Sequence, residues 1–151
     1  MHEILSQLVM KWARFGPDNR IDVCDDFTRL TLDSIGLVAM DTRFNSYYKQ
    51  ELHPFPGAMG TALTEAGRRA ARPSMFKPFA RSAEKKYYDD IETMRSISLD
   101  ITANRKVHPT DKKDLVNAML NGKEPQTGKK MTDESIADNM IPFLIAGMTT
   151  L

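Results

Sequence analysis

Apolar residues recur along most of the chain at the three- and four-residue spacing of an α-helix. In the first fifteen residues they are Ile4, Leu5, Leu8, Val9, Trp12 and Phe15. This spacing puts them on one stripe and predicts an amphipathic helix that packs on one side only. The sequence Gly-Pro-Asp-Asn at residues 16–19 predicts the end of that helix, because glycine and proline interrupt helical runs.

A second helix is expected to begin near Asp25 and Asp26, whose carboxylates are favourable at the positive end of the helix dipole. The apolar residues that follow are Phe27, Leu30, Leu32, Ile35, Leu37 and Val38. These six residues are spread around the helix, so that little of its surface is polar. A helix that is apolar nearly all round is expected to lie in a core.

Four further helices are predicted, over residues 57–72, 80–106, 114–120 and from Thr132 onward. The prolines of the segment RPSMFKPF separate the first two, because proline removes a backbone donor. Asn121-Gly122 predicts a left-handed end to the short third helix. Thr132 is a favourable cap for the last helix, with two acidic residues in its first turn. No convincing strand or repeat is present, so the fold class is all-α.

The last predicted helix ends in NMIPFLIAGMTTL, residues 139–151. Pro142 deprives the Asp138 carbonyl of its amide partner and predicts a bend. Ala146 and Gly147 leave room for a flat or bulky group against the helix. The alternative is a close helix crossing over small residues, which local features alone favour. Thr150 could hydrogen-bond back to the Ala146 carbonyl.

Composition narrows the possible functions. The 151 residues are 41% hydrophobic and 27% charged, which is typical of one globular domain. A net charge of +1 gives no overall field to attract nucleic acid, and the apolar run at residues 141–148 is too short to span a bilayer. Cys24 is the only cysteine, which excludes an intrachain disulfide and favours a reducing, cytoplasmic location. His2, His53 and His108 are too scattered to predict a metal site.

Two distant segments resemble the same protein family. They are DDFTRLTLDSIGLVAMDTRFNSYYKQELHPF at residues 25–55 and MLNGKEPQTGKKMTDESIADNMIPFLIAGMTT at residues 119–150. Both are similar to segments of cytochrome P450 monooxygenases, and most similar to self-sufficient fatty-acid hydroxylases fused to an NADPH-dependent flavin reductase. The resemblance implies a partial helical bundle that corresponds to helices D through the first half of I. Residues 1–151 would then form a single incomplete domain.

In that family the central helix carries Ala-Gly, a variable residue, an acid and a threonine, and it crosses the distal face of haem. The resemblance assigns Ala146 and Gly147 to cofactor binding and Thr150 to the oxygen-facing threonine. Thr149 then occupies the position where the acid is expected. If one residue has been lost from this segment, Thr149 is instead the counterpart of the oxygen-facing threonine. In either case the acid is missing, and proton delivery should be impaired because a hydroxyl does not release a proton near neutral pH.

The resemblance also implies a channel for a fatty acid or similar lipid. Met59 and Leu63 match apolar positions on the helix that borders the channel, and Ile145 and Ala146 match its inner wall. An apolar channel suits an acyl chain, because burial stabilises each methylene by about 0.8 kcal/mol. Ordinary core packing is the alternative for all four residues.

Features that hold the haem iron in this family are not found in the sequence. The glycine-rich loop with the iron-binding cysteine is missing, and Cys24 instead precedes an apolar helix. The sequence is therefore interpreted as an internal fragment of an NADPH-dependent haem-thiolate monooxygenase, inactive alone. Haem, O2, a fatty acid, and FAD and FMN in a fused or partner reductase are implied. The alternative function is a non-catalytic helical interaction module that uses the exposed apolar face of its last helix. The alternative to a purely cytoplasmic location is peripheral attachment to a membrane.

Overall fold

The computed structural model describes residues 2–16, 19–48, 51–73 and 80–149. These residues form six α-helices and one short 3-10 helix: α1 (His2–Phe15), α2 (Val23–Met40), η1 (Ser46–Tyr48), α3 (Pro54–Ala71), α4 (Arg81–Val107), α5 (Leu115–Asn121) and α6 (Asp133–Thr149). Within the described part of the chain, the only β-type pairing is a single bridge between Lys123 and Lys130. The prediction of an all-α fold is confirmed.

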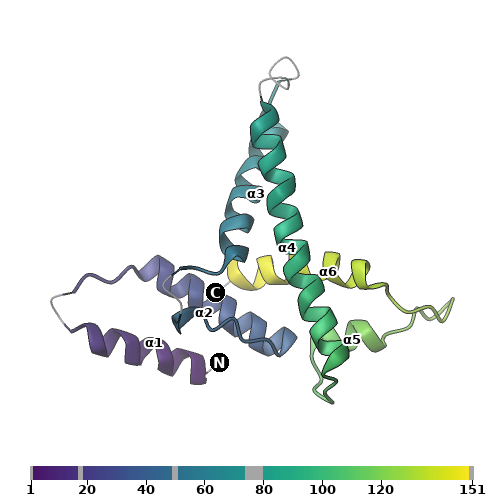
Figure 1. Cartoon of the computed structure of the whole chain (residues 1–151), viewed down its shortest axis with the longest axis horizontal. Coiled ribbons are helices and arrows are strands. Elements are labelled where there is room, and N and C mark those ends of the chain that lie inside the picture. The colour runs from purple at the N-terminus through teal and green to yellow at the C-terminus, as the bar shows by residue number, and fades with distance from the viewer. Residues whose placement is uncertain (1, 17–18, 49–50, 74–79, 150–151) are drawn as a thin grey trace.

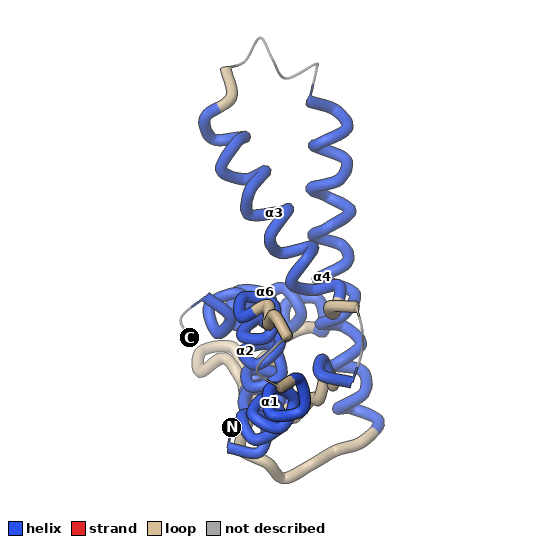
Figure 2. The backbone as a smooth tube through the Cα atoms, turned by 90° about the vertical axis from the view of Figure 1, so that its left-hand side faces the viewer, coloured by secondary structure: helices blue, strands red, loops and turns tan. Residues whose placement is uncertain are grey.

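The helices form an upright arm on a wider body (Figure 1). The arm is the antiparallel pair of α3 and α4, and its lower end meets α6, which runs across the body (Figures 1 and 2). α2 contacts α6, and α1 packs on α2. The core lies where α2, α4 and α6 converge, and it includes Leu32, Met94, Ile101, Met140 and Leu144.

Side chains at the helix ends explain where several helices begin. The Asp22 carboxylate accepts a hydrogen bond from the Asp25 amide at 3.0 Å and caps α2. α3 begins at Pro54, three residues before its predicted start, because His53 Nδ1 accepts from the Phe55 amide at 3.3 Å. Proline is favourable in the first turn of a helix, where its missing donor has no partner to lose.

Two local predictions are wrong. α2 is not buried on all sides: Phe27 and Val38 are 43% and 58% exposed, because α1 and α6 cover only part of its surface. Gly122 does not have a left-handed backbone, since its φ is −61° and its ψ is 140°. The chain instead continues in an extended conformation from Gly122 into the Lys123–Lys130 bridge.

α6 continues through Pro142 to Thr149 as one helix. None of the helices in the described part of the chain combines the length and the apolar character needed to cross a bilayer.

Asp33 on α2 holds the following loop against the helix. Its carboxylate accepts hydrogen bonds from the Ser46 amide at 3.0 Å and from the Ser46 hydroxyl at 3.3 Å. Arg29, one turn earlier, donates to the Ser46 carbonyl. Burial raises the pKa of Asp33 above its ordinary value, and the hydrogen bonds from Ser46 offset only part of that increase.

The replacement Asp33→Asn is expected to make the stability of the chain less dependent on pH. Because the folded-state pKa of Asp33 is raised, its ionisation destabilises the fold as pH rises from the ordinary carboxyl pKa through the raised value. An asparagine can still accept from the Ser46 amide and has no charge to desolvate. Urea unfolding should therefore show a larger gain, or a smaller loss, from Asp33→Asn at pH 7 than at pH 4. Equal differences at the two pH values would contradict this prediction.

Candidate functional site

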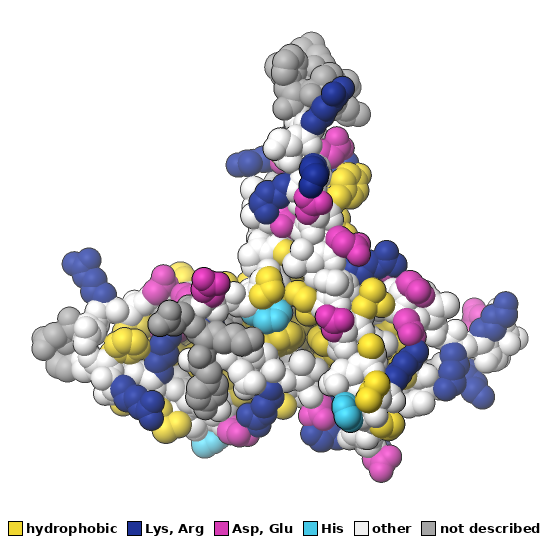
Figure 3. All heavy atoms as spheres, viewed as in Figure 1, with side chains coloured by type: hydrophobic (Ala, Val, Ile, Leu, Met, Phe, Trp, Pro, Cys, Tyr) yellow, Lys and Arg dark blue, Asp and Glu magenta, His cyan; other side chains and the backbone are white. Residues whose placement is uncertain are grey.

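A largely apolar pocket of about 270 Å³, open to solvent on one side, lies where α3, α4 and α6 meet and is called the chamber below. Its lining consists of Met59, Ala62, Leu63, Ala66, Tyr87, Ile91, Met94, Asp138, Ile141, Pro142 and Ile145. Figure 3 shows hydrophobic side chains gathered where the arm joins the body, whereas the upper arm is mostly charged. The chamber lies near this junction, because α6 meets the lower end of the arm there.

Helical spacing on each of the three helices explains this lining. Met59 and Leu63 are four residues apart on α3, and Ile141 and Ile145 are four residues apart on α6. Residues at this spacing lie on the same face of a helix. Ala62 and Ala66 fill little of the space beside α3, which leaves the chamber open.

The structure brings together three of the four side chains that were predicted to contact substrate. Met59 and Leu63 face Ile145 across the chamber. Ala146, the fourth, is not in the lining and is exposed on a different side of α6. Their proposed role in substrate binding stays a prediction, but the shared cavity that it requires is present.

α6 has one buried face and one exposed flank. Ile136, Met140 and Leu144 are completely buried in the core. Asn139, Pro142, Phe143 and Ala146 are exposed outside this face, Phe143 at 50%, and Pro142 also borders the chamber. The last three of these form a mainly apolar surface, which is called the α6 flank below.

Ala146 and Gly147 point in different directions. A Cβ atom on Gly147 would lie 2.5 Å from Cγ1 and 2.7 Å from Cδ1 of Ile35 on α2. Gly147 therefore allows α2 and α6 to cross closely, as the alternative based on local features suggested. Ala146 lies on the α6 flank, where a small side chain leaves space for a flat group.

The two threonines are only partly within the described structure. Thr149 is the last residue of α6, but its side chain is outside the described part of the chain. Thr150 lies wholly outside the described residues. Their assignment to oxygen binding or proton transfer stays a prediction from the sequence.

The described residues fit one face of a haem but do not supply an iron ligand. The α6 flank offers apolar and small side chains, which suit the face of a flat macrocycle. Cys24 is exposed in the first turn of α2 and is not in a glycine-rich loop. Among the described residues, no three His, Cys, Asp or Glu side chains are grouped to hold a metal ion.

Sequence reasoning missed the contribution of α4 to the chamber. Tyr87, Ile91 and Met94 fall at helical spacing within the predicted helix over residues 80–106, but periodicity does not say which other helix such a stripe meets. The ring of Tyr87 lies under the Arg69 guanidinium, with 4.7 Å between Arg69 Cζ and the ring centroid. At the other end of the chamber Arg95 forms an ion pair with Asp138 at 3.1 Å.

The chain belongs to the cytochrome P450 family: a family model described as "Cytochrome P450" matches residues 1–151. It is 54% identical over 150 residues to a bifunctional cytochrome P450/NADPH–P450 reductase of Aspergillus oryzae, and 54% identical over 151 residues to one of Fusarium oxysporum. A self-sufficient cytochrome P450 monooxygenase of Phanerodontia chrysosporium is 48% identical over 147 residues. These alignments cover 97–99% of this chain and 14% of each relative. The chain therefore spans about one seventh of the length of these relatives.

Proposed function

We propose that residues 1–151 are part of the single haem domain of an NADPH-dependent haem-thiolate monooxygenase that hydroxylates a fatty acid or similar lipid. The observation that carries the proposal is the position of the chamber: the helix that lines it through Ile145 also presents Ala146 on its outer flank. One helix could thus border both a lipid and a haem.

The chamber supports an acyl chain as the substrate class. Nearly all of its lining is apolar, and Asp138 and the Tyr87 hydroxyl are the only ionisable groups that border it among the residues placed in the structure. Each buried methylene contributes about 0.8 kcal/mol, so an alkyl chain gains more from this space than a compact polar molecule does. Met59, Leu63 and Ile145 would position that chain.

In the proposed enzyme the α6 flank would hold one face of the haem. Haem with a thiolate ligand supplies the chemistry of O2 activation, because the thiolate favours O–O cleavage. Ala146 would leave room for the macrocycle, and Phe143 and Pro142 would exclude water beside it. Gly147 would act from the opposite side, by setting how closely α6 approaches α2. FAD and FMN in a fused or partner reductase would supply the electrons.

The α6 flank also supports a second candidate function, a non-catalytic interaction module. The half-exposed Phe143 on the α6 flank could contact a protein partner as readily as a cofactor. Haem binding distinguishes the two candidate functions, because only the monooxygenase requires it. The proposal includes a cytoplasmic location and, for the isolated chain, no activity.

The proposal is tested by a chimera in which residues 1–151 replace the matching segment of the Fusarium oxysporum relative. After reduction and addition of carbon monoxide, the chimera should give the Soret band of a thiolate-ligated haem, and dodecanoate should stimulate its NADPH oxidation. The isolated chain, mixed with haem, should not give that band. A chimera that folds but binds no haem would favour the interaction module.

Thr149→Glu in the same chimera is expected to raise the fraction of NADPH that ends in hydroxylated product. A carboxylic acid can relay protons near neutral pH, whereas the threonine hydroxyl cannot, and general acid catalysis contributes about 10²-fold or more to such steps. Thr149→Gln is the matched control, since it has similar size and no acid. Tight coupling in the unmodified chimera, or equal coupling in the two variants, would refute the assigned position of the missing acid.

A further inference from the structure

α6 carries a backbone carbonyl that has lost its usual hydrogen-bond partner. In an α-helix the carbonyl of residue i accepts from the amide of residue i+4, and Pro142 has no amide hydrogen to donate to the backbone carbonyl of Asp138. The next amide, that of Phe143, bonds to the Asn139 carbonyl in the same pattern. Because α6 continues through Pro142 as one helix, the Asp138 carbonyl oxygen keeps its capacity to accept a hydrogen bond from outside the helix.

The position of this carbonyl on α6 places it beside the chamber. A helical carbonyl points along the axis toward residue i+4, so it lies on the helix surface between those two residues. Asp138 and Pro142 both line the chamber, together with Ile141 and Ile145 on the same face of α6. Asp138 and Pro142 are also exposed. The carbonyl therefore lies at the open side of the chamber, where a ligand can reach it.

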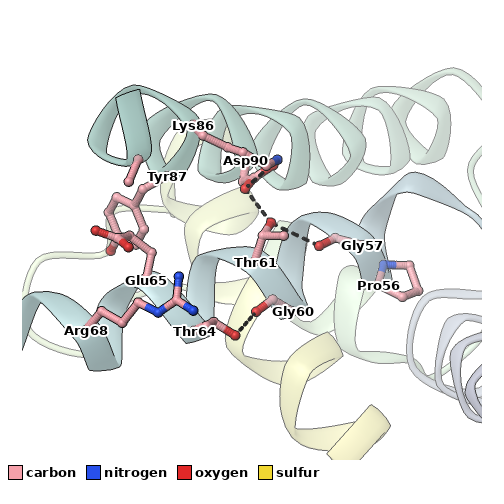
Figure 4. A pocket seen from close by; sticks show the side chains of 11 residues that line it. Pro56, Gly57, Gly60, Thr61, Thr64, Glu65, Arg68, Lys86, Tyr87 and Asp90 are labelled. Atoms are coloured by element: carbon pink, nitrogen blue, oxygen red, sulfur yellow. Dashed lines mark hydrogen bonds and ion pairs between the residues drawn. The ribbon is translucent and has the colours of Figure 1, made fainter. Parts of the chain in front are cut away.

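α3 shows how a hydroxyl group binds to a helical carbonyl. A groove of about 540 Å³ lies between α3 and α4, and Figure 4 shows two threonines of α3 at its border. The Thr64 hydroxyl donates to the Gly60 carbonyl at 2.8 Å, and the Thr61 hydroxyl donates to the Gly57 carbonyl at 3.1 Å. A carbonyl oxygen has two lone pairs and can accept a hydroxyl in addition to an amide. The Asp138 carbonyl lacks that amide, so it has more capacity for a hydroxyl than either of these.

We propose that the backbone carbonyl of Asp138 accepts a hydrogen bond from a hydroxyl group on an alkyl chain bound in the chamber. This inference rests on the proposed function and narrows its substrate class to lipids that carry a hydroxyl. An ionised carboxylate cannot supply this bond, because it has no hydrogen to donate. The side chain of Asp138 has a partner of its own, since its Oδ1 lies 3.1 Å from Nε of Arg95.

The test compares 1-octanol with 1-methoxyheptane on the purified 151-residue chain by isothermal titration calorimetry at neutral pH. The two ligands have the same number of non-hydrogen atoms, but only the alcohol donates a hydrogen bond. Pro142→Val restores the amide of residue 142 and keeps an apolar side chain of similar size. It should lower the preference for the alcohol about fivefold, the usual effect of one neutral hydrogen bond. Because proline is unfavourable inside a helix, the variant should fold at least as well as the wild type.

Four control variants distinguish the carbonyl from the other groups of the chamber. Pro142→Ala restores the same amide with a smaller side chain and should lower the preference by the same factor. Pro54→Ala removes a proline from the first turn of α3, where no helical carbonyl gains a partner, and should leave the preference unchanged. Asp138→Ala and Tyr87→Phe remove the ionisable side-chain groups of the chamber and should also leave the preference unchanged.

Leu63→Glu shows whether the ligands bind in the chamber. Leu63 is 48% exposed, so the variant should fold, and its charge in the lining should weaken both ligands. If both ligands weaken while Pro142→Val keeps the full preference for the alcohol, or if Asp138→Ala abolishes that preference, the role of the carbonyl is refuted and the chamber stands. If the folded wild type binds neither ligand, or if Leu63→Glu weakens neither, the lipid chamber and the role of the carbonyl both fail. Circular dichroism of each variant confirms its fold.

Discussion

Replacing Gly147 with alanine is expected to lower the free energy of unfolding of the chain by about 1–3 kcal/mol, the usual range for overpacking a core. The new Cβ atom would lie 2.5 Å from Cγ1, 2.7 Å from Cδ1 and 3.0 Å from Cβ of Ile35. Because the last of these belongs to the stem of a β-branched side chain, rotation of Ile35 cannot remove the whole conflict. Urea unfolding measures the loss.

Two variants show whether the loss comes from this contact. Gly67→Ala changes another glycine inside a helix, but nothing lies within 4 Å of its new Cβ atom, so it should stabilise the chain by about 0.4–1 kcal/mol. Combining Gly147→Ala with Ile35→Ala should destabilise less than the sum of the two single replacements, since the smaller side chain makes room. Strict additivity would show that α2 and α6 are not in close contact at Gly147.

Replacing Arg105 with alanine is expected to destabilise the chain by about 3–5 kcal/mol, the loss found when one partner of a buried ion pair is removed. Arg105 is 6% exposed and joins three elements. Its guanidinium donates to Asp114 at 2.9 Å and to the Met40 carbonyl at 2.8 Å. Loss of Arg105 would leave the cap of α5 and the end of α2 without their shared donor.

The contrast with an exposed pair makes this prediction specific. Arg43→Ala breaks the pair with Glu3, in which both side chains are exposed, and should change the free energy of unfolding by less than about 1 kcal/mol. Arg105→Met combined with Asp114→Asn should be less destabilising than Arg105→Ala, because no charge is left buried without a partner. Similar effects of Arg105→Ala and Arg43→Ala would contradict the buried role of Arg105.

The ion pair between Arg105 and Asp114 should be sensitive to acid, because Asp114 can be protonated. Burial acts to raise the pKa of Asp114, but hydrogen bonds from Arg105 and from the Asn117 amide outweigh it and hold the pKa below its ordinary value. A lowered pKa means that the stabilisation is present above the ordinary carboxyl pKa and is lost as pH falls through the folded-state value. The difference between wild type and Arg105→Ala should therefore shrink in acid.

Hydrophobic periodicity was sufficient to predict the helices but not their exposure. The stripe at Ile4 and Leu8 correctly predicts one buried side of α1, and both residues are buried. For α2 the same reasoning failed. Apolar residues on nearly every side of a helix do not show which of those sides other helices will cover. Two left-handed residues also escaped prediction: Asp41, which follows α2, and Asn45, which precedes η1, have positive φ values, whereas Gly122 does not.

The chamber was predictable only where the resemblance to a family supplied tertiary information. Met59, Leu63 and Ile145 came from that resemblance, and they do share a cavity. Tyr87 and Ile91 come from α4, and no pattern within α4 predicts contact with both α3 and α6. The sequence likewise did not predict that Ala146 and Gly147 would face different surroundings, because this depends on where Ile35 of α2 lies.

The arm formed by α3 and α4 is attached to the body at its lower end only, and its upper half extends beyond α6 (Figure 2). A tilt of this pair about its attachment would have its pivot beside the chamber. A small tilt that widens the space near Ala62 and Met94 is magnified in proportion to distance at Ala71 and Arg81, where the arm is farthest from α6. Paired spin labels on the distal arm and on α5 would therefore measure any tilt that accompanies entry of a ligand into the chamber, without touching anything inside it.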